Sequence, residues 1–183
     1  MTKLVVVDTN VPLTANGAAD ASPDCVVTCV DALVEILSDK RPIAIDNGWR
    51  ILREYMRNLS PSGQPGISNR FLKWVLTNRA NPARCVQVSI TPRSDDKENF
   101  EEFPDEPGLK SFDRSDRKFV AVVCAHPDRP PILEALDSKW WGWREPLRRV
   151  GVTVMFLCPE EIQALYEQKF GQRRRRRRRP TRG

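Results

Sequence analysis

Short runs of apolar, β-branched residues alternate along the chain with segments in which apolar residues recur at helical spacing. Residues 3–7 form such a run, which is typical of a parallel strand covered on both faces. In residues 25–37 the apolar side chains follow the period of a helix. Because strands separated by helices favour parallel pairing, we predict a three-layer α/β/α fold around a central parallel sheet of about five strands. The further predicted strands lie at 42–45, 85–90, 132–136 and 152–157, and the further predicted helices at 49–59, around 71–77, at 116–125 and at 160–170.

The length of 183 residues suits one folded domain, which we place at residues 1–171. The longest apolar runs, at 4–7 and 119–125, are far shorter than the roughly 18 residues of a membrane span. Asp8 interrupts the first apolar run too early for a secretory signal. We therefore expect a protein that neither enters a membrane nor is exported, and that resides in the cytoplasm.

The net charge of +6 comes from the end of the chain. Eight of the 30 basic residues are arginines at 173–179 and 182, so the remainder carries 22 basic and 24 acidic residues, a net charge of −2. Seven consecutive arginines repel one another and favour polyanions, so we predict that residues 172–183 are a disordered tail that binds nucleic acid. The tail residues expected to bind are Arg173, Arg174, Arg175, Arg176, Arg177, Arg178 and Arg179.

The cysteines and the histidine exclude several kinds of site. Five cysteines, an odd number without a CxxC pair, lie mostly in apolar surroundings, which predicts reduced core thiols rather than zinc ligands. The only histidine, His126, precedes a proline at a predicted helix end, where a structural role is expected. A Ser/His or Cys/His triad is therefore not expected, and the chain has no glycine-rich phosphate-binding motif.

Acidic residues follow three of the predicted strands, where parallel sheets place their functional crevice. They are Asp8, Asp46 and Asp137, and a fourth, Asp116, begins an apolar helix on its buried side. Taken alone, each is better explained as a helix cap, most of all Asp46, which is predicted to be a turn or cap. Carboxylates that converge stay ionised only beside a cation, so the set indicates a site for Mg²⁺ or Mn²⁺.

Four acidic segments, in order, resemble those of the PIN domain, a metal-dependent ribonuclease fold. They are Leu4-Val-Val-Val-Asp-Thr-Asn-Val, Asp46-Asn-Gly-Trp-Arg-Ile-Leu-Arg-Glu-Tyr, Phe112-Asp-Arg-Ser-Asp-Arg-Lys-Phe-Val-Ala-Val and Leu136-Asp-Ser-Lys-Trp, and they span residues 4 to about 157. The resemblance implies metal-binding and catalytic roles for Asp8, Glu54, Asp116 and Asp137. It implies supporting positions around them for Asn10, Asp113 and Ser138.

Two positions of this resemblance leave alternatives open. Glu54 could be an exposed residue paired with Arg50, and Glu35 bears the same relation to the apolar face of its own helix, so periodicity does not choose between the two glutamates. Lys139 stands where many relatives have a further acid. It could neutralise a substrate phosphate, or it could mark a site with weakened affinity for metal.

The resemblance implies hydrolysis of phosphodiester bonds in nucleic acid, with single-stranded RNA favoured and DNA as an alternative. Because the body is slightly acidic, substrate attraction is expected to come largely from the arginine tail. Trp140, Trp141 and Trp143 flank Gly142 beside the proposed site. Trp140 is the candidate for stacking on bases, and core packing is the alternative for at least two of the three.

Residues 91–112 contain three prolines and a glycine, which predicts a long irregular loop. Within it, residues 95–106 carry seven acids and one lysine. A solvated loop is the default interpretation. A second hypothesis is that these acids dock the arginine tail and reduce activity until nucleic acid competes.

Several other functions compete with the nuclease. A catalytically silent PIN-like module would bind nucleic acid or a partner protein. A phosphatase of the haloacid dehalogenase type would need an acid where Asn10 stands, and a phosphate-accepting receiver domain would need paired acids after the first strand. A neutralising partner protein and a homodimer are both compatible with the resemblance.

Overall fold

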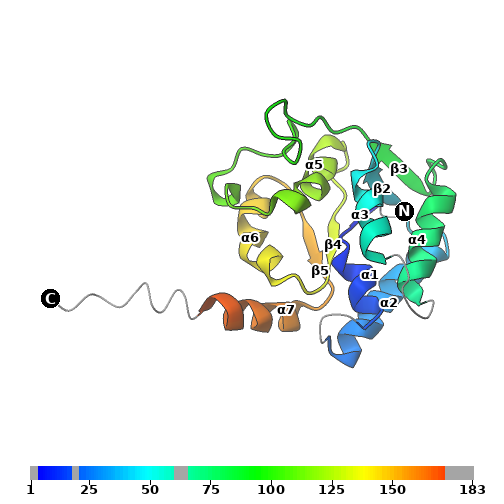
Figure 1. The fold of residues 1–183 in the computed structure, drawn as a ribbon. Helices are drawn as coiled ribbons and strands as arrows, with labels where there is room; N and C mark the ends of the chain where they lie inside the picture. The colour runs from blue at the N-terminus through cyan, green and yellow to red at the C-terminus, as the bar shows by residue number, and fades with distance from the viewer. Residues whose placement is uncertain (1–3, 18–20, 60–65, 172–183) are drawn as a thin grey trace.

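The structure is a computed structural model that describes residues 4–17, 21–59 and 66–171 (Figure 1). The predicted arginine tail lies outside the described residues. The strands are β1 (Val6–Val7), β2 (Ile43–Asp46), β3 (Cys85–Val88), β4 (Ile132–Glu134) and β5 (Val154–Phe156). The helices are α1 (Asn10–Ala15), α2 (Pro23–Leu37), α3 (Arg50–Leu59), α4 (Ile67–Asn78), α5 (Arg117–Ala125), α6 (Ser138–Arg149) and α7 (Pro159–Tyr166), with 3₁₀ turns at Pro107–Leu109 and Arg114–Asp116 and a π-helical turn at Glu167–Gly171.

The five strands are all parallel, but they form two sheets instead of the single central sheet that we predicted. One sheet has the order β1-β4-β5, and the other pairs β2 with β3. A parallel bridge between Val5 and Ile43 connects the two sheets. Strand β1 also contacts β2, but the hydrogen-bonded pairing between the two sheets is limited to this bridge at Val5, the residue before β1. The fold is therefore mixed α/β with a small parallel sheet and a parallel strand pair.

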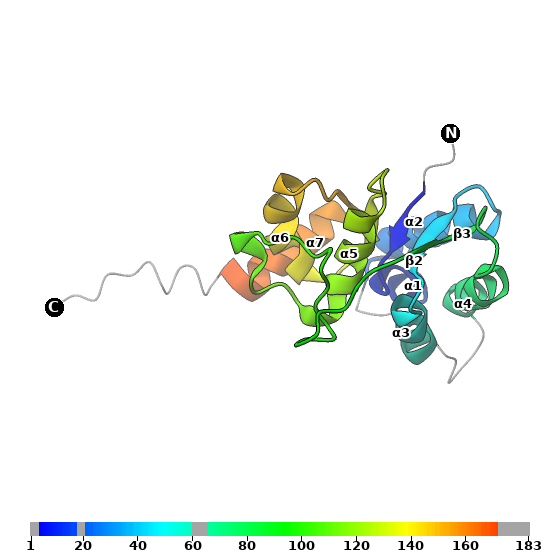
Figure 2. The same cartoon turned by 90° about the horizontal axis from the view of Figure 1, so that it is seen from above.

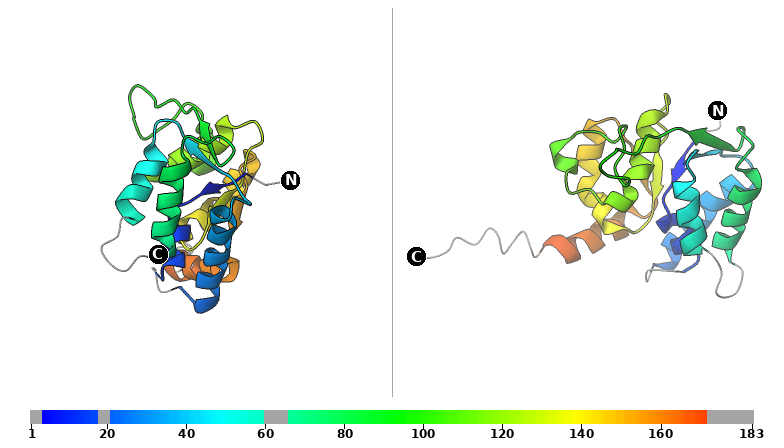
Figure 3. Two further views of the ribbon diagram at one scale, coloured as in Figure 1. Left: turned by 90° about the vertical axis from the view of Figure 1, so that its right-hand side faces the viewer. Right: turned by 45° about the horizontal axis from the view of Figure 1, so that its top comes forward.

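The helices pack around these strands. Helix α5 lies against β1, β2 and β4, while α3 contacts β2 and α6 contacts β5. Figures 1 and 3 show α6 and α7 at one end of the molecule and α3 and α4 at the other. The buried core runs through β1, β2 and β4, whose residues are all buried, so the acids that follow these strands start from the centre of the molecule.

The predicted helices at 25–37, 49–59, 71–77, 116–125 and 160–170 are confirmed, with ends that differ by a few residues. Helices α1 and α6 were not predicted. Helix α6 contains Gly142 and Pro146, two residues that weaken a helical pattern in the sequence. Its N-terminus is capped by Asp137, whose side chain accepts a hydrogen bond from the Lys139 N–H.

The connection from β3 to α5 is irregular, as predicted, apart from the two 3₁₀ turns. Figure 2 shows it crossing from the β3 end of the molecule towards α5 and α6. It is not simply a solvated loop, because Phe100, Phe103 and Phe112 are buried in the core. The acids of this loop pair with arginines of the described body, since Arg114 contacts Asp96 at 2.5 Å. Whether they also dock the tail depends on residues outside those described.

The prediction of reduced thiols is wrong for two cysteines. Cys25, in the first turn of α2, forms a disulfide with Cys158, which caps α7, across a sequence separation of 133 residues. Cys29, Cys85 and Cys124 are free. A contact between residues so distant along the chain leaves no trace in local sequence spacing. Among the described helices, none combines the length and apolarity needed to cross a membrane.

Candidate acidic site

Asp8 directly follows the buried strand β1 and is itself only 3% exposed. Its Oδ1 accepts a hydrogen bond of 2.8 Å from the backbone N–H of Asn10. Burial raises the pKa of Asp8 from 3.8 to about 6, and the nearby charge of Glu54 adds to this, while hydrogen bonds from Asn10 and Glu134 oppose it. Asp8 is thus a buried carboxyl group whose negative charge is only partly compensated.

Glu134, the last residue of β4, was not among the predicted site residues. Because Val7 pairs with Leu133 in parallel register, the next residues, Asp8 and Glu134, come side by side. Glu134 is fully buried, and burial together with the charge of Asp8 raises its pKa well above the ordinary value. Its Oε1 accepts a hydrogen bond of 2.9 Å from the Asp137 N–H. A glutamate inside an apolar strand is itself unusual, and that signal was present in the sequence.

The carboxyl groups of Glu134 and Asp8 lie close enough to shift each other's pKa. Oε2 of Glu134 is buried and has no hydrogen-bond partner among the described residues. A proton on Glu134, or a cation beside this oxygen, would satisfy it.

Asp116 lies at the start of α5 without using its side chain as a cap. Burial raises its pKa from 3.8 to about 8, and the charges of Asp8, Asp113 and Asp137 add to the shift, while Lys118 opposes it. The fold therefore brings three of the four predicted ligands, Asp8, Asp116 and Asp137, close enough for the charges of Asp8 and Asp137 to raise the pKa of Asp116. Asp46, by contrast, is a cap as predicted, since its carboxylate accepts the N–H groups of Arg50 and Ile51.

Helix α3 places Glu54 near Asp8, which keeps Glu54 as the predicted residue of this site. Its Oε1 accepts a hydrogen bond of 2.6 Å from the Thr9 hydroxyl, and its Oε2 lies 2.5 Å from Nζ of Lys118. The alternative pairing with Arg50 does not occur, because Arg50 contacts Asp46. Glu35 instead pairs with Arg41 elsewhere, at 2.6 Å. Both oxygens of Glu54 are thus already engaged.

Lys139 and Asp113 form an ion pair at the edge of the site, with 2.7 Å between Nζ and Oδ2. The hydrogen bond from Lys139 lowers the pKa of Asp113, which also accepts hydrogen bonds from Ser115. Ser138 is buried in the first turn of α6. Asn10, Asp113 and Ser138 therefore lie beside the acids, and Lys139 neutralises Asp113.

Trp140 does not fit the predicted role in base stacking. Its side chain is fully buried and packs edge-on against Phe112, with 5.1 Å between ring centroids. Trp143 also packs against Phe112, and Trp141 packs against Phe156. The alternative of core packing is thus confirmed, because Trp140 is buried and the partly buried Trp141 and Trp143 pack against the core.

A groove of about 600 Å³ opens beside the acids. Its walls come from α3, from the loop after β3 and from the segment before α5, and six of its lining residues are basic. Glu54 and Lys118 line it as well as belonging to the acidic site, so the two features meet there. The slightly acidic net charge of the body therefore does not describe this surface. The lining residues are Arg50, Arg53, Glu54, Met56, Arg57, Lys97, Glu98, Phe100, Arg114, Ser115 and Lys118.

The donor chemistry of the acids suits a hard cation, because carboxylate oxygens are the ligands that Mg²⁺ and Mn²⁺ prefer. Burial is the main cause of the raised pKa values of Asp8 and Asp116, and neighbouring negative charges, which such a cation would offset, add to it. Glu54 fits less well, since Lys118 already neutralises it. Within the described ranges, no three carboxylates bring one oxygen each within 4.8 Å of one another, and a grouping that close occurs only for three cysteines.

Comparisons of the chain with family models, with curated proteins and with solved structures found no match.

Proposed function

We propose that this protein is a metal-dependent nuclease of the PIN type that hydrolyses phosphodiester bonds, with single-stranded RNA favoured over DNA. The observation that supports the proposal best is the meeting of the buried acids with the basic groove at Glu54 and Lys118. A polyanionic substrate needs cationic side chains along its backbone, and hydrolysis of its phosphodiester needs a cation site beside them.

We infer that the two sheets act as one sheet of order β3-β2-β1-β4-β5 within a single domain at residues 1–171. The bridge from Val5 to Ile43 supports this, as do hydrogen bonds that link Val5 to Pro42 and Ala44. In such a sheet the carboxyl ends of β1 and β4 adjoin at its centre, which is where Asp8 and Glu134 lie.

Asp8, Glu134, Asp116 and Asp137 are the residues that would hold Mg²⁺ or Mn²⁺ in this proposal. When bound, the ion would lower the pKa of a bound water and stabilise charge on the phosphate. Glu134 and Asp116 would each give up the proton that burial favours. Lys118, which pairs with Glu54 in the wall of the groove, would neutralise a phosphate, and Arg57 and Lys97, which also line the groove, would bind other phosphates.

The decisive experiment incubates labelled single-stranded RNA and DNA with wild type and with Asp8→Asn, in Mn²⁺ or in chelator. We expect RNA cleavage in Mn²⁺ that falls by at least about a hundredfold in Asp8→Asn or in chelator, because the central carboxylate or its cation is gone. Asp31→Asn changes an exposed acid in the middle of α2 and serves as the matched control. Cleavage that survives both Asp8→Asn and chelator would contradict the proposal.

A second candidate is a catalytically silent module that binds nucleic acid. The ion pair of Glu54 with Lys118, which occupies a proposed ligand, favours it. The same experiment separates the two candidates, since the silent module would bind the labelled strand equally well in wild type and Asp8→Asn and would cleave it in neither.

A further inference from the structure

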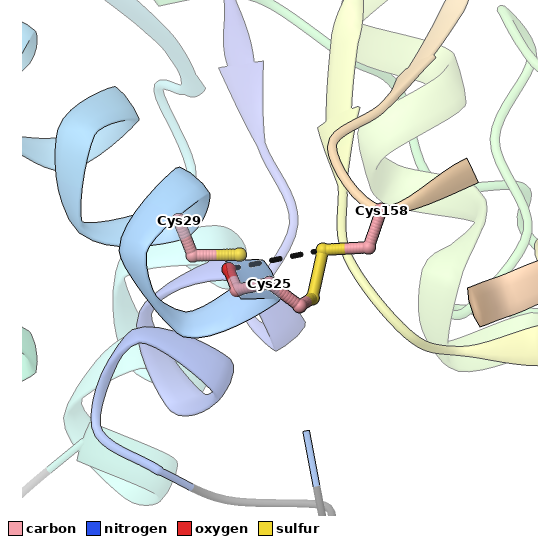
Figure 4. Close-up of side chains that lie close together, drawn as sticks. All are labelled: Cys25, Cys29 and Cys158. Atoms are coloured by element: carbon pink, nitrogen blue, oxygen red, sulfur yellow. Dashed lines mark hydrogen bonds between the residues drawn. A yellow bond between two sulfur atoms is a disulfide. The ribbon is translucent and has the colours of Figure 1, made fainter. Parts of the chain in front are cut away.

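Three cysteine sulfurs converge where α2 meets the start of α7 (Figure 4). Cys25 and Cys29 lie one helical turn apart on α2, and Cys158 caps the N-terminus of α7. Their sulfur atoms all lie within 4.8 Å of one another, and all three residues are buried. Cys25 and Cys158 form the disulfide, while the thiol of Cys29 points towards it without being part of it.

The third sulfur is the feature that a disulfide does not explain. A cross-link between α2 and α7 needs Cys25 and Cys158 alone, yet Cys29 contributes a third sulfur from the same face of α2 because residues four apart on a helix lie one above the other. Cys85 and Cys124, the other free cysteines, belong to β3 and α5 and do not share this cluster. Three convergent sulfurs are typical of a site for a thiolate-binding cation.

We propose that, after reduction of the disulfide, Cys25, Cys29 and Cys158 form a three-thiolate site for one cation of the zinc class. Sulfur ligands select soft and borderline cations over Mg²⁺ and Mn²⁺, so this site and the acidic site take different metals. Glu161, in the first turn of α7, is a nearby oxygen donor that is held by Ser22 at 2.7 Å. The disulfide and the bound cation are two alternative cross-links between the same pair of helices.

A dithiol is the reductant that converts the disulfide into the cation site. The dithiol transfers two electrons and two protons to the sulfurs of Cys25 and Cys158 and becomes a disulfide itself. The cation then replaces three thiol protons, which pass to the buffer, and forms three metal–sulfur bonds. No other co-reactant is required.

Acidic residues lie near the buried Cys29 thiol. Burial raises the pKa of this thiol to about 12, with further contributions from the charges of Glu134 and Glu161. The same negative charges attract a cation to this position.

The test uses the full chain, which is reduced with a dithiol and then separated from the dithiol in the absence of oxygen. The reduced protein is titrated with Co²⁺, whose thiolate complexes have charge-transfer absorption. We expect one equivalent to bind to the reduced protein, with displacement by Zn²⁺ but not by excess Mg²⁺, and no such absorption from the oxidised protein. Cys29→Ser should lower the affinity by about tenfold or more, because one of three ligands is lost. Cys124→Ser, which leaves the cluster intact, should titrate as wild type does.

Two results would overturn the proposal: a reduced wild type without charge-transfer absorption, or a Cys29→Ser variant that binds Co²⁺ as tightly as wild type. Circular dichroism checks that each variant is folded. If Cys29→Ser does not fold, Cys158→Ser replaces it, because this residue lies at a helix end and its loss must weaken binding equally. The readout does not depend on nuclease activity, so the cysteine site and the acidic site succeed or fail separately.

Discussion

Asp8 and Glu134 illustrate how strongly one residue's chemistry depends on a neighbour that is distant in sequence. They lie side by side because Val7 and Leu133 pair in parallel register, and burial raises the pKa of both carboxyls. Sequence patterns could place Asp8 at the end of a strand. They could not place Glu134 next to it, because register is decided by contacts between strands.

The pKa of Asp116 predicts a pH-dependent stability. It is raised from 3.8 to about 8, so between about pH 4 and pH 8 the folded state binds more protons than the unfolded state, and stability falls as pH rises through this range. In chelator, Asp116→Asn should therefore raise the free energy of unfolding by about 1–3 kcal/mol at pH 8 and change it little at pH 4.

Urea denaturation at the two pH values measures this difference. Asp31→Asn, on an exposed position of α2, should leave the free energy of unfolding unchanged within about 0.5 kcal/mol at both. A stabilisation by Asp116→Asn that is equal at pH 4 and pH 8 would show that charge burial is not its cause.

At the scale of elements, helix α3 carries Glu54 to the site and is held there by Tyr55. The Tyr55 side chain is fully buried, and its hydroxyl donates a hydrogen bond to the backbone carbonyl of Val7, the last residue of β1. Its ring packs against Phe71 of α4, with 5.3 Å between centroids. The apolar period of α3 predicted which face is buried, but this polar contact with β1 needed the assembled fold.

Tyr55→Phe is expected to lower the free energy of unfolding by about 1–2 kcal/mol, because the Val7 carbonyl loses a buried donor while the ring packing is kept. Tyr166→Phe, at a half-buried position in α7, should change it by less than about 0.5 kcal/mol. Thermal or urea unfolding of the two variants compares them directly. Equal stabilities would mean that this hydrogen bond does not hold α3 against β1.

At the scale of the whole molecule, basic charge is distributed in two places. The groove beside the acids gathers six basic side chains on a body that is slightly acidic overall, and the arginine run adds seven more at 173–179. In our proposal, the groove and the arginine run both contribute to the binding of single-stranded nucleic acid, and each adds to the dependence of affinity on salt.

We predict that replacing Arg57 and Lys97, two exposed groove residues, with alanine reduces the slope of log affinity against log salt by about 1–1.5. Each phosphate contact contributes roughly 0.7 to this slope. Anisotropy of labelled single-stranded RNA, measured in an Asp8→Asn background to prevent cleavage, gives the slope. Deletion of residues 172–183 should reduce it further and independently.

The control for the groove is the double variant Arg70→Ala and Arg148→Ala, which removes two exposed basic residues from α4 and α6 outside the groove. It should leave the slope unchanged. If the control variant reduced the slope as much as the groove variant does, binding would depend on net charge alone.

The sequence by itself determined the five strands, five of the seven described α-helices and the acids that follow the strands, because all of these depend on local periodicity and on neighbours along the chain. Only the tertiary structure decided that Glu54 pairs with Lys118, that Cys25 is joined to Cys158 and that Trp140 faces the core. These outcomes follow from contacts between distant segments, whose energies depend on register, burial and distance. Local sequence patterns do not contain these three quantities.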